Sequence, residues 1–170
     1  MTLYLESLFV YGGDNMNINL ERVAVDKKDT LYRLLEYSLY EESLTDGNEM
    51  NEDAIFEYKY FNKYFTDNNR DAFFIKEQES NKLLGFVMIN TYMQHTKEGH
   101  SIAEFMVIPK YRRNKIGKKV AFMCFDLYQG AWEVSPSKGN EIAYKFWKRI
   151  IDEYTNKNKA FKDGIFSFKK

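Results

Sequence analysis

A cationic turn between an apolar strand and a helix is the feature that most constrains how this chain can fold. Residues 104–119 run from an apolar segment through Pro109 into a turn and then into the start of a helix. Main-chain N–H groups at a helix start form an anion site when cations gather around them. No acid interrupts the cations of this segment, which are Lys110, Arg112, Arg113, Lys115, Lys118 and Lys119. The pattern therefore predicts a ligand with a phosphate end and a long uncharged arm.

Length and charge favour one domain with a small anionic ligand. The chain has 170 residues, which is an ordinary size for a single domain, and 44% of them are hydrophobic, which is enough for a core. The formal net charge is zero. A global basic field of the kind that nucleic acids attract is therefore absent, and we expect no nucleic-acid partner.

The single cysteine and the lack of a long apolar run indicate a cytoplasmic protein. Cys124 is the only cysteine, which excludes a disulfide framework and fits a cytoplasmic protein. No apolar run is long enough to span a bilayer, so no membrane partner is expected. Residues 1–15 make a poor signal peptide because Glu6 interrupts their apolar run and no cationic region precedes it. Met16 is a second candidate for the native start, so we expect a single domain over residues 16–170 and a possible N-terminal extension over 1–15.

Apolar periodicity predicts a mixed α/β domain. Residues 17–25 alternate as a half-buried strand does, whereas the apolar positions of residues 141–152 cover one wide helical face. The predicted strands are 17–25, 71–78, 83–92, 101–108, 131–135 and 161–168. The predicted helices run from a cap at Asp29 or Thr30 to about Glu41, and over 52–65, 117–129 and 141–152. The resulting order is β-α-α-β-β-β-α-β-α-β.

Two motifs resemble those of a known family. The first resembles the acetyl-CoA-binding motif of the GNAT acetyltransferases, Arg/Gln-x-x-Gly-x-Gly/Ala, and its residues here are Val107, Pro109, Tyr111, Arg112, Lys115 and Gly117. The second glycine is kept and Lys115 replaces the first. The second motif, Asn140-x-x-Ala143-x-x-Phe146-Trp147, resembles the later Asn-x-x-Ala-x-x-Phe-Tyr helix of the family.

The resemblance implies a GNAT-like acyl-CoA N-acyltransferase fold. Its central mixed, mostly antiparallel sheet has splayed central strands and is flanked by helices. The strand 101–108 would splay from 131–135, and the pantetheine arm of acetyl-CoA would lie in the gap. Main-chain groups of Met106 and Ile108 would pair with the arm, and the Val107 N–H would polarise the thioester oxygen.

The cationic turn would hold the coenzyme A pyrophosphate. The resemblance assigns this contact to Arg112, Arg113, Asn114, Lys115, Gly117 and Lys118. Lys115 lacks the conformational freedom of glycine but adds a cation, so we expect an altered loop geometry with binding retained. Alternatively, these cations only solvate a helix start. Asn140 would contact the pantetheine arm, cap the following helix, or do both.

Glu104 is the candidate general base on the predicted strand. An amine acceptor is protonated at neutral pH, and a carboxylate at this position can remove the proton directly or through a water. The alternative is an ordinary solvent-facing or salt-bridged glutamate. The family often uses a tyrosine to protonate the departing thiolate, but Trp147 occupies that position and cannot do so. Tyr128 and Tyr154 are other candidates, and a thiolate can also leave without a dedicated acid.

The acceptor pocket of such a fold would lie near residues 40–70 and 92–100. The first of these regions is acidic, with Glu41, Glu42, Asp46, Glu49, Glu52 and Asp53. An acidic mouth would attract a cationic amine, although a solvated acidic face is the simpler interpretation. His95 and His100 flank one polar loop, where a solvated histidine is expected more often than one facing the acceptor. They are too few for a metal site, so we expect no metal.

The resemblance as a whole implies an N-acetyltransferase. It would transfer an acetyl group from acetyl-CoA to a primary amine of a small molecule or peptide by direct attack, without a covalent enzyme intermediate. A homodimer is a further expectation. Trp147 keeps one alternative open, a non-catalytic acyl-CoA-binding or regulatory module of the same fold. A nucleic-acid binder that uses residues 110–119 is a second alternative, against which net neutrality argues.

Overall fold

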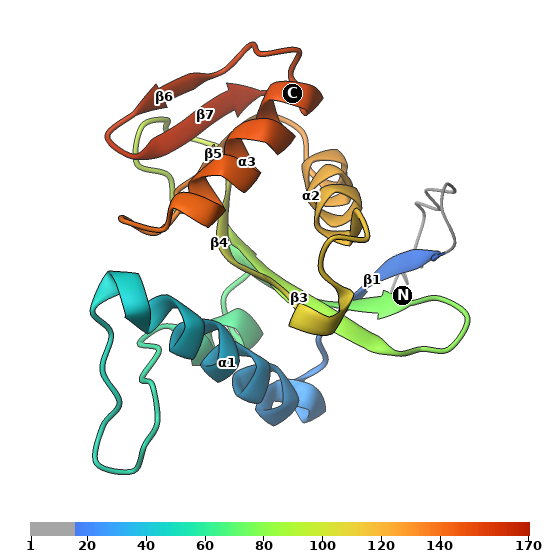
Figure 1. Ribbon diagram of the computed structural model, residues 1–170, viewed down its shortest axis with the longest axis vertical. Helices are drawn as coiled ribbons and strands as arrows, with labels where there is room; N and C mark the ends of the chain where they lie inside the picture. The colour runs from blue at the N-terminus through green and yellow to red at the C-terminus, as the bar shows by residue number, and fades with distance from the viewer. Residues whose placement is uncertain (1–15) are drawn as a thin grey trace.

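One seven-stranded sheet forms the centre of the protein. The computed structural model describes residues 16–170, and the possible extension over 1–15 lies outside the described residues. The strand order is β1-β2-β3-β4-β5-β7-β6 (Figure 1). The strands are β1 (Ile18–Arg22), β2 (Arg70–Glu77), β3 (Leu83–Asn90), β4 (His100–Val107), β5 (Ala131–Val134), β6 (Ala160–Lys162) and β7 (Ile165–Lys169). Only β4 and β5 are parallel among these strands, so the expected mixed, mostly antiparallel sheet is confirmed.

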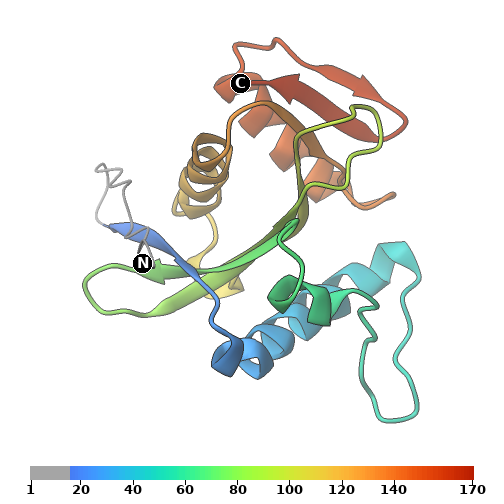
Figure 2. The same cartoon turned by 180° about the vertical axis from the view of Figure 1, so that it is seen from behind.

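Helices cover both faces of this sheet. The α1 helix (Lys28–Asp46) and the 3₁₀ helix η2 (Phe61–Phe65) lie on one face, while α2 (Ile116–Leu127) and α3 (Glu141–Tyr154) lie on the other (Figure 2). Two further 3₁₀ turns, Val25–Lys27 and Pro109–Tyr111, precede α1 and α2. Within residues 16–170, none of the helices combines the length and the apolar character that crossing a membrane requires.

The central strand β3 supplies both cores. Phe86 and Met88 are buried among residues of α1 and η2, whereas Val87 and Ile89 are buried with residues of α2 and α3. Successive side chains of a strand point to opposite faces, so a strand that is covered on both sides must be apolar throughout. The predicted strand over residues 83–92 is therefore confirmed as β3, which ends at Asn90.

The predicted helix over residues 52–65 is wrong. Only its end forms the short η2, and the preceding residues form a loop. The Asn51 side-chain oxygen accepts hydrogen bonds from the N–H groups of Asp53 and Ile55, and Ala54 has a φ of 59°. Side-chain bonds of this kind compete with the helical backbone pattern.

The first helix is longer than predicted. It begins after the N-cap residue Lys27, ahead of the expected cap at Asp29 or Thr30, and it continues past Glu41 to Asp46. Gly47 ends it in the left-handed conformation that glycine adopts without steric cost. The extension beyond Glu41 adds two acidic residues, Glu42 and Asp46, to the helix.

The predicted strand 161–168 is a hairpin rather than one strand. Lys162 pairs with Ile165 across Asp163 and Gly164, which have φ values of 52° and 82°. Positive φ at both central residues is the signature of a tight two-residue hairpin, and Asp-Gly is one of its preferred sequences.

The expected splay of the two central strands is confirmed. The pairing of β4 with β5 is limited to His100–Trp132, Ser101–Glu133 and Ile102–Val134. Among the described strands, β5 provides no partner for residues 103–107 of β4, although β4 continues to pair with β3 on its other side. An open edge of β4 therefore lies in the middle of the sheet.

A substitution at Gly85 tests how closely β3 and β4 approach each other. A Cβ atom at Gly85 would lie 2.0 Å from the Met106 carbonyl oxygen, which is a main-chain atom and cannot rotate away. We expect Gly85→Ala to lower the free energy of unfolding by roughly 3 kcal/mol, measured by urea denaturation. Gly47→Ala is the control, because nothing lies within 4 Å of its Cβ and only the positive φ is strained. Equal losses in the two variants would contradict the close approach.

Candidate active site

The open edge of β4 is the first part of the candidate site. The Ile108 N–H donates to the Leu84 carbonyl at 2.8 Å, which directs the main chain of Ile108 toward β3. Main-chain groups of neighbouring residues point to opposite edges of a strand, so those of Val107 face away from β3. The Val107 carbonyl accepts a hydrogen bond from Arg112 Nε at 2.7 Å on that side. Val107 therefore presents its N–H and carbonyl groups to the splay.

The structure does not place the main chains of Met106 and Ile108 at this edge. Both Ile108 groups are used inside the protein, since its carbonyl accepts from the Tyr111 N–H at 2.8 Å. Met106 is paired with Phe86 of β3. The residue that shares the edge with Val107 is Phe105, which sequence reasoning missed. The two-residue period of a strand could have found it, because an outward-facing Val107 excludes positions 106 and 108.

The cationic turn forms a concave main-chain surface at the start of α2. Arg113 and Lys115 have φ values of 68° and 58°, and Lys115 is the N-cap residue of the helix. Left-handed residues within a turn direct successive N–H groups toward one side, where an anion can bind. The first helical N–H groups have no carbonyl partner within the helix, which adds to this site. Lys115 thus adopts the conformation that the family's glycine would favour.

The side chains of the turn are directed to several different elements. Arg112 pairs with Glu41 of α1 at 2.7 Å, and Lys118 pairs with Glu153 of α3. The Asn114 amide donates to the Tyr111 carbonyl at 3.4 Å. A Cβ atom at Gly117 would lie 3.0 Å from the Phe146 ring, so this glycine lets α2 pack closely on α3.

The side chains of the second motif, residues 140–147, mainly stabilise the fold. The Asn140 side-chain oxygen accepts from the Ala143 N–H at 2.9 Å, which confirms the expected cap of α3. Trp147 is 6% exposed and packs edge-on against Phe105 at a centroid distance of 5.0 Å, so it belongs to the core. The contact of Asn140 with an arm stays a prediction.

The tyrosines that were considered as general acids have other partners. The Tyr128 hydroxyl donates to Asp71, and the Tyr154 hydroxyl donates to Asp126 at 2.8 Å. None of these contacts directs a tyrosine hydroxyl to the open edge of β4.

Glu104 is partly buried and lies on the α1 side of the sheet. Burial, together with the nearby carboxylates of Glu42 and Asp46, raises the pKa of Glu104 from 4.5 to about 8. The nearby Tyr58 side chain acts in the opposite direction and lowers this pKa. These surroundings differ from those of an ordinary solvent-facing glutamate. A carboxyl group that titrates near neutral pH is suited to accept a proton from an amine.

The acids near Glu104 come from the end of α1. Cations are favoured at the C-terminus of a helix, yet the last turn of α1 has none and contains Asp46. Burial and the charge of Asp46 raise the pKa of Glu42 as well. The same end of α1 contacts the cationic turn through the ion pair of Glu41 with Arg112. Thr45 lies near Gly139 before α3, where an added Cβ atom would come within 3.8 Å of its side chain. A local departure from the helix-charge rule is typical of functional sites.

The loop between β3 and β4 is fixed by a buried carboxylate. Glu133 of β5 is 2% exposed and accepts hydrogen bonds from the N–H groups of Gln94, His95 and Thr96 at 2.7–3.1 Å. The expectation of a solvated His100 is wrong. His100 begins β4 and stacks on the Tyr128 ring at 4.2 Å, and burial lowers its pKa.

Histidine, cysteine, aspartate and glutamate side chains are the groups that could hold a metal ion. Within residues 16–170, no group of three or more histidine, cysteine, aspartate or glutamate side chains is arranged to hold a metal ion. Cys124 is fully buried, and burial raises the pKa of its thiol. It is therefore a small core residue.

A family profile identifies the fold and the type of enzyme. The profile described as "Acetyltransferase (GNAT) family" matches residues 36–151, which is more than half of the chain. The chain belongs to the GNAT acetyltransferase family. The expected fold and the expected acetyltransferase class are therefore confirmed. The family typically uses acetyl-CoA as its co-substrate. No curated protein sequence matches the chain.

Solved structures agree with this GNAT assignment. An acetyltransferase from Thermus thermophilus superposes with a TM-score of 0.64 at 15% identity, over 90% of this chain and 97% of the other. A probable GNAT acetyltransferase from Chromobacterium violaceum has a TM-score of 0.63 at 15% identity, over 99% and 94%. An aminoglycoside acetyltransferase from an uncultured soil metagenomic sample, solved with sisomicin, has a TM-score of 0.55 at 21% identity, over 78% and 86%.

The pKa of Glu104 predicts a pH-dependent stability. Between pH 4.5 and about 8 the folded chain keeps the Glu104 proton and the unfolded chain loses it, so the free energy of unfolding falls as the pH rises. Gln cannot titrate. We therefore expect Glu104→Gln to become more stable relative to wild type by up to about 5 kcal/mol across this range, measured by urea denaturation.

The control for this measurement is Glu52→Gln at an exposed loop position. Its stability relative to wild type should stay constant over the same pH range. A constant difference for Glu104→Gln as well would show that the folded chain does not retain the proton.

Proposed function

We propose that this GNAT domain is an N-acetyltransferase that transfers an acetyl group from acetyl-CoA to a cationic primary amine. The observation that carries the proposal is the open edge of β4, where Val107 presents its main chain between the cationic turn and Glu104. Acetyl-CoA would supply the activated acetyl group. A small-molecule amine is the simplest acceptor, and a peptide amine has the same reacting group.

The chain offers fitting contacts for each part of acetyl-CoA. The N–H groups of residues 113–118 and the charges of Arg113 and Lys115 would hold the diphosphate. The main-chain groups of Phe105 and Val107 would pair with the pantetheine arm in the manner of an added strand. The Val107 N–H would donate to the thioester oxygen as negative charge develops on it.

The acidic end of α1 supports a cationic acceptor. Glu42 and Asp46 lie near Glu104, so an ammonium group entering this region would be attracted. The ionised Glu104 would remove one proton from the ammonium, which leaves the neutral amine that attacks the thioester. The aminoglycoside enzyme among the structural neighbours makes a polycationic amine a reasonable first choice of substrate.

A non-catalytic acyl-CoA-binding module remains the second candidate. This candidate is supported by Trp147, which lies in the core at the position where the family usually has a tyrosine acid. The two candidates differ in turnover. Acetyl-CoA binding without coenzyme A release on any amine of a panel would favour the module.

Removal of the proposed base should separate binding from catalysis. We expect the purified chain to release coenzyme A with aminoglycosides or polyamines. Glu104→Gln should lower kcat/KM for the amine at least about 100-fold because the proton acceptor is lost. The affinity for acetyl-CoA, measured by calorimetry, should be unchanged. Full activity of Glu104→Gln would exclude Glu104 as the base.

Loss of charge in the turn should weaken donor binding. Arg113→Asn removes the cation and places a residue that tolerates positive φ, so the loop can keep its shape. We expect the Kd of acetyl-CoA to rise about three- to tenfold, and the effect to shrink at high salt. Lys63→Gln, at an exposed position of η2, is the matched control and should bind normally. An unchanged Kd for Arg113→Asn would move the diphosphate away from this turn.

A further inference from the structure

The α1 helix forms the outer layer on its side of the sheet (Figure 2), and its outward face carries a row of exposed large side chains. Tyr37, Tyr40 and Leu44 are 67%, 64% and 89% exposed. Their spacing of three and four residues places them on one side of the helix, opposite the buried face that includes Leu31 and Leu35. A single exposed leucine is ordinary, but large side chains that are contiguous over two helical turns mark an interaction surface.

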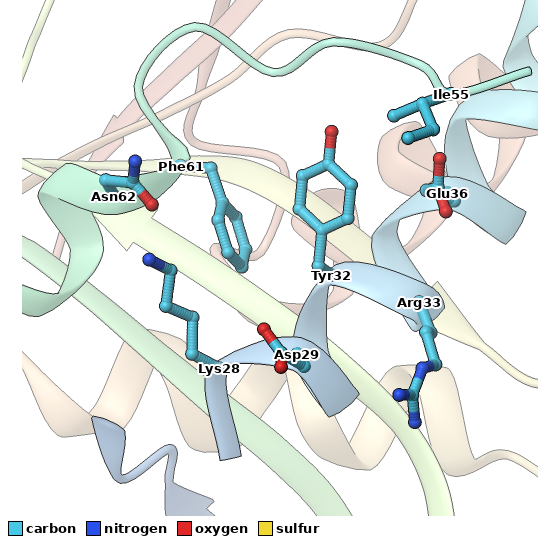
Figure 3. Close-up of a pocket in the computed structure, with 8 residues that line it drawn as sticks. All are labelled: Lys28, Asp29, Tyr32, Arg33, Glu36, Ile55, Phe61 and Asn62. Atoms are coloured by element: carbon cyan, nitrogen blue, oxygen red, sulfur yellow. The ribbon is translucent and has the colours of Figure 1, made fainter. Parts of the chain in front are cut away.

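The same row continues toward the N-terminus of α1 with a cation. Arg33 lies four residues before Tyr37 and is exposed. Figure 3 shows Arg33 extending from α1 on the side away from Phe61 and Asn62, whereas Lys28 extends toward Asn62. Among the described residues, neither Arg33 nor Lys28 forms an ion pair. Positive charge at this end of the helix is therefore available to a partner.

Charge is divided unevenly along α1 and the loop that follows it. Over residues 27–33 three of the four charged residues are cations, whereas every charged residue of the segment 36–53 is an acid. Glu49 and Glu52 of the loop form no ion pair with the rest of the described chain. A surface with opposite charges at its two ends is complementary to itself when two copies lie antiparallel, and it repels itself when they lie parallel.

We propose that α1 pairs with α1 of a second copy of this chain, antiparallel about a twofold axis that passes between Tyr37 and Tyr40. In this register Tyr37 of one copy lies against Tyr40 of the other, and Arg33 lies against Leu44. The cationic end of each helix then faces the acidic end and loop of the second copy. Side chains at spacings of four and three residues interlock along such a helix pair. The interface is independent of the proposed function.

The size of the exposed row determines how strong this contact is. Two tyrosines and a leucine at these exposures offer roughly 400 Å² of accessible area per copy, which is about half of what a stable interface buries. The remainder comes from flanking residues such as Arg33, whose aliphatic stem can cover apolar surface. We therefore expect a micromolar Kd, to which the complementary charges contribute.

Sedimentation velocity of the purified chain over micromolar concentrations measures the association. We expect wild type to approach a dimer as its concentration rises, and salt to weaken the dimer. Tyr40→Glu removes apolar contact and places like charges across the axis, so the Kd should rise at least about tenfold. Arg33→Glu should also weaken the dimer, because both ends of the row are then acidic. The control is Lys145→Gln, at an exposed position of α3 on the opposite face of the sheet, which changes the net charge as Tyr40→Glu does and should match wild type.

Single cysteines determine how the two helices are oriented. Cys124 is fully buried, so it does not interfere. In the antiparallel pair the two Arg33 positions lie about 16 Å apart along the helix axis, which is too far for a disulfide, whereas Arg33 lies opposite Leu44. Under mild oxidation we expect Arg33→Cys alone to form no cross-linked dimer. A mixture of Arg33→Cys with Leu44→Cys should form one.

Each outcome supports or overturns this interface. A wild-type chain that stays monomeric at every concentration overturns it, and so does an unchanged Kd for Tyr40→Glu, because the dimer then uses another surface. A cross-link between two copies of Arg33→Cys overturns the antiparallel arrangement. Circular dichroism verifies that the variants fold, as their exposed positions lead us to expect. A wild-type dimer that Tyr40→Glu and Arg33→Glu both dissociate, together with the mixed cross-link, supports the interface.

Discussion

The early end of the pairing between β4 and β5 is the constraint on which the rest of the structure depends. Backbone N–H and carbonyl groups inside a protein need partners, and β5 supplies none beyond Ile102. The edge of β4 near Val107 must find them elsewhere. The cationic turn reaches this edge through the hydrogen bond of Arg112 with the Val107 carbonyl, and the end of α1 is linked to the turn through the ion pair of Glu41 with Arg112.

Much of the fold could be predicted from local patterns. The apolar run of β3 and the one-sided face of α3 are strong signals, because burial on two faces or one face leaves a direct imprint on the sequence. The failure at residues 52–65 has a specific cause. Their apolar spacing is compatible with a helix, but the side chain of Asn51 bonds to the backbone and favours a turn.

The site was predictable where it depends on sequence neighbours and unpredictable where it depends on tertiary contacts. The turn and Val107 belong to one short motif, so their placement followed from it. The environment of Glu104 is built by Tyr58 and Glu42, which come from other segments of the chain. No periodicity links these residues, and the only local signal was the unusual concentration of acids at the end of α1.

The hydrogen bond from Arg112 to the Val107 carbonyl has an energetic consequence. A pantetheine amide that pairs with this carbonyl would compete with the guanidinium, which keeps its second partner, Glu41. The exchange replaces one hydrogen bond with another, so it adds little net free energy at this position. If the chain binds coenzyme A as proposed, discrimination in favour of its derivatives over simpler thioesters would come from the phosphate end of the ligand, where the chain has positive charge.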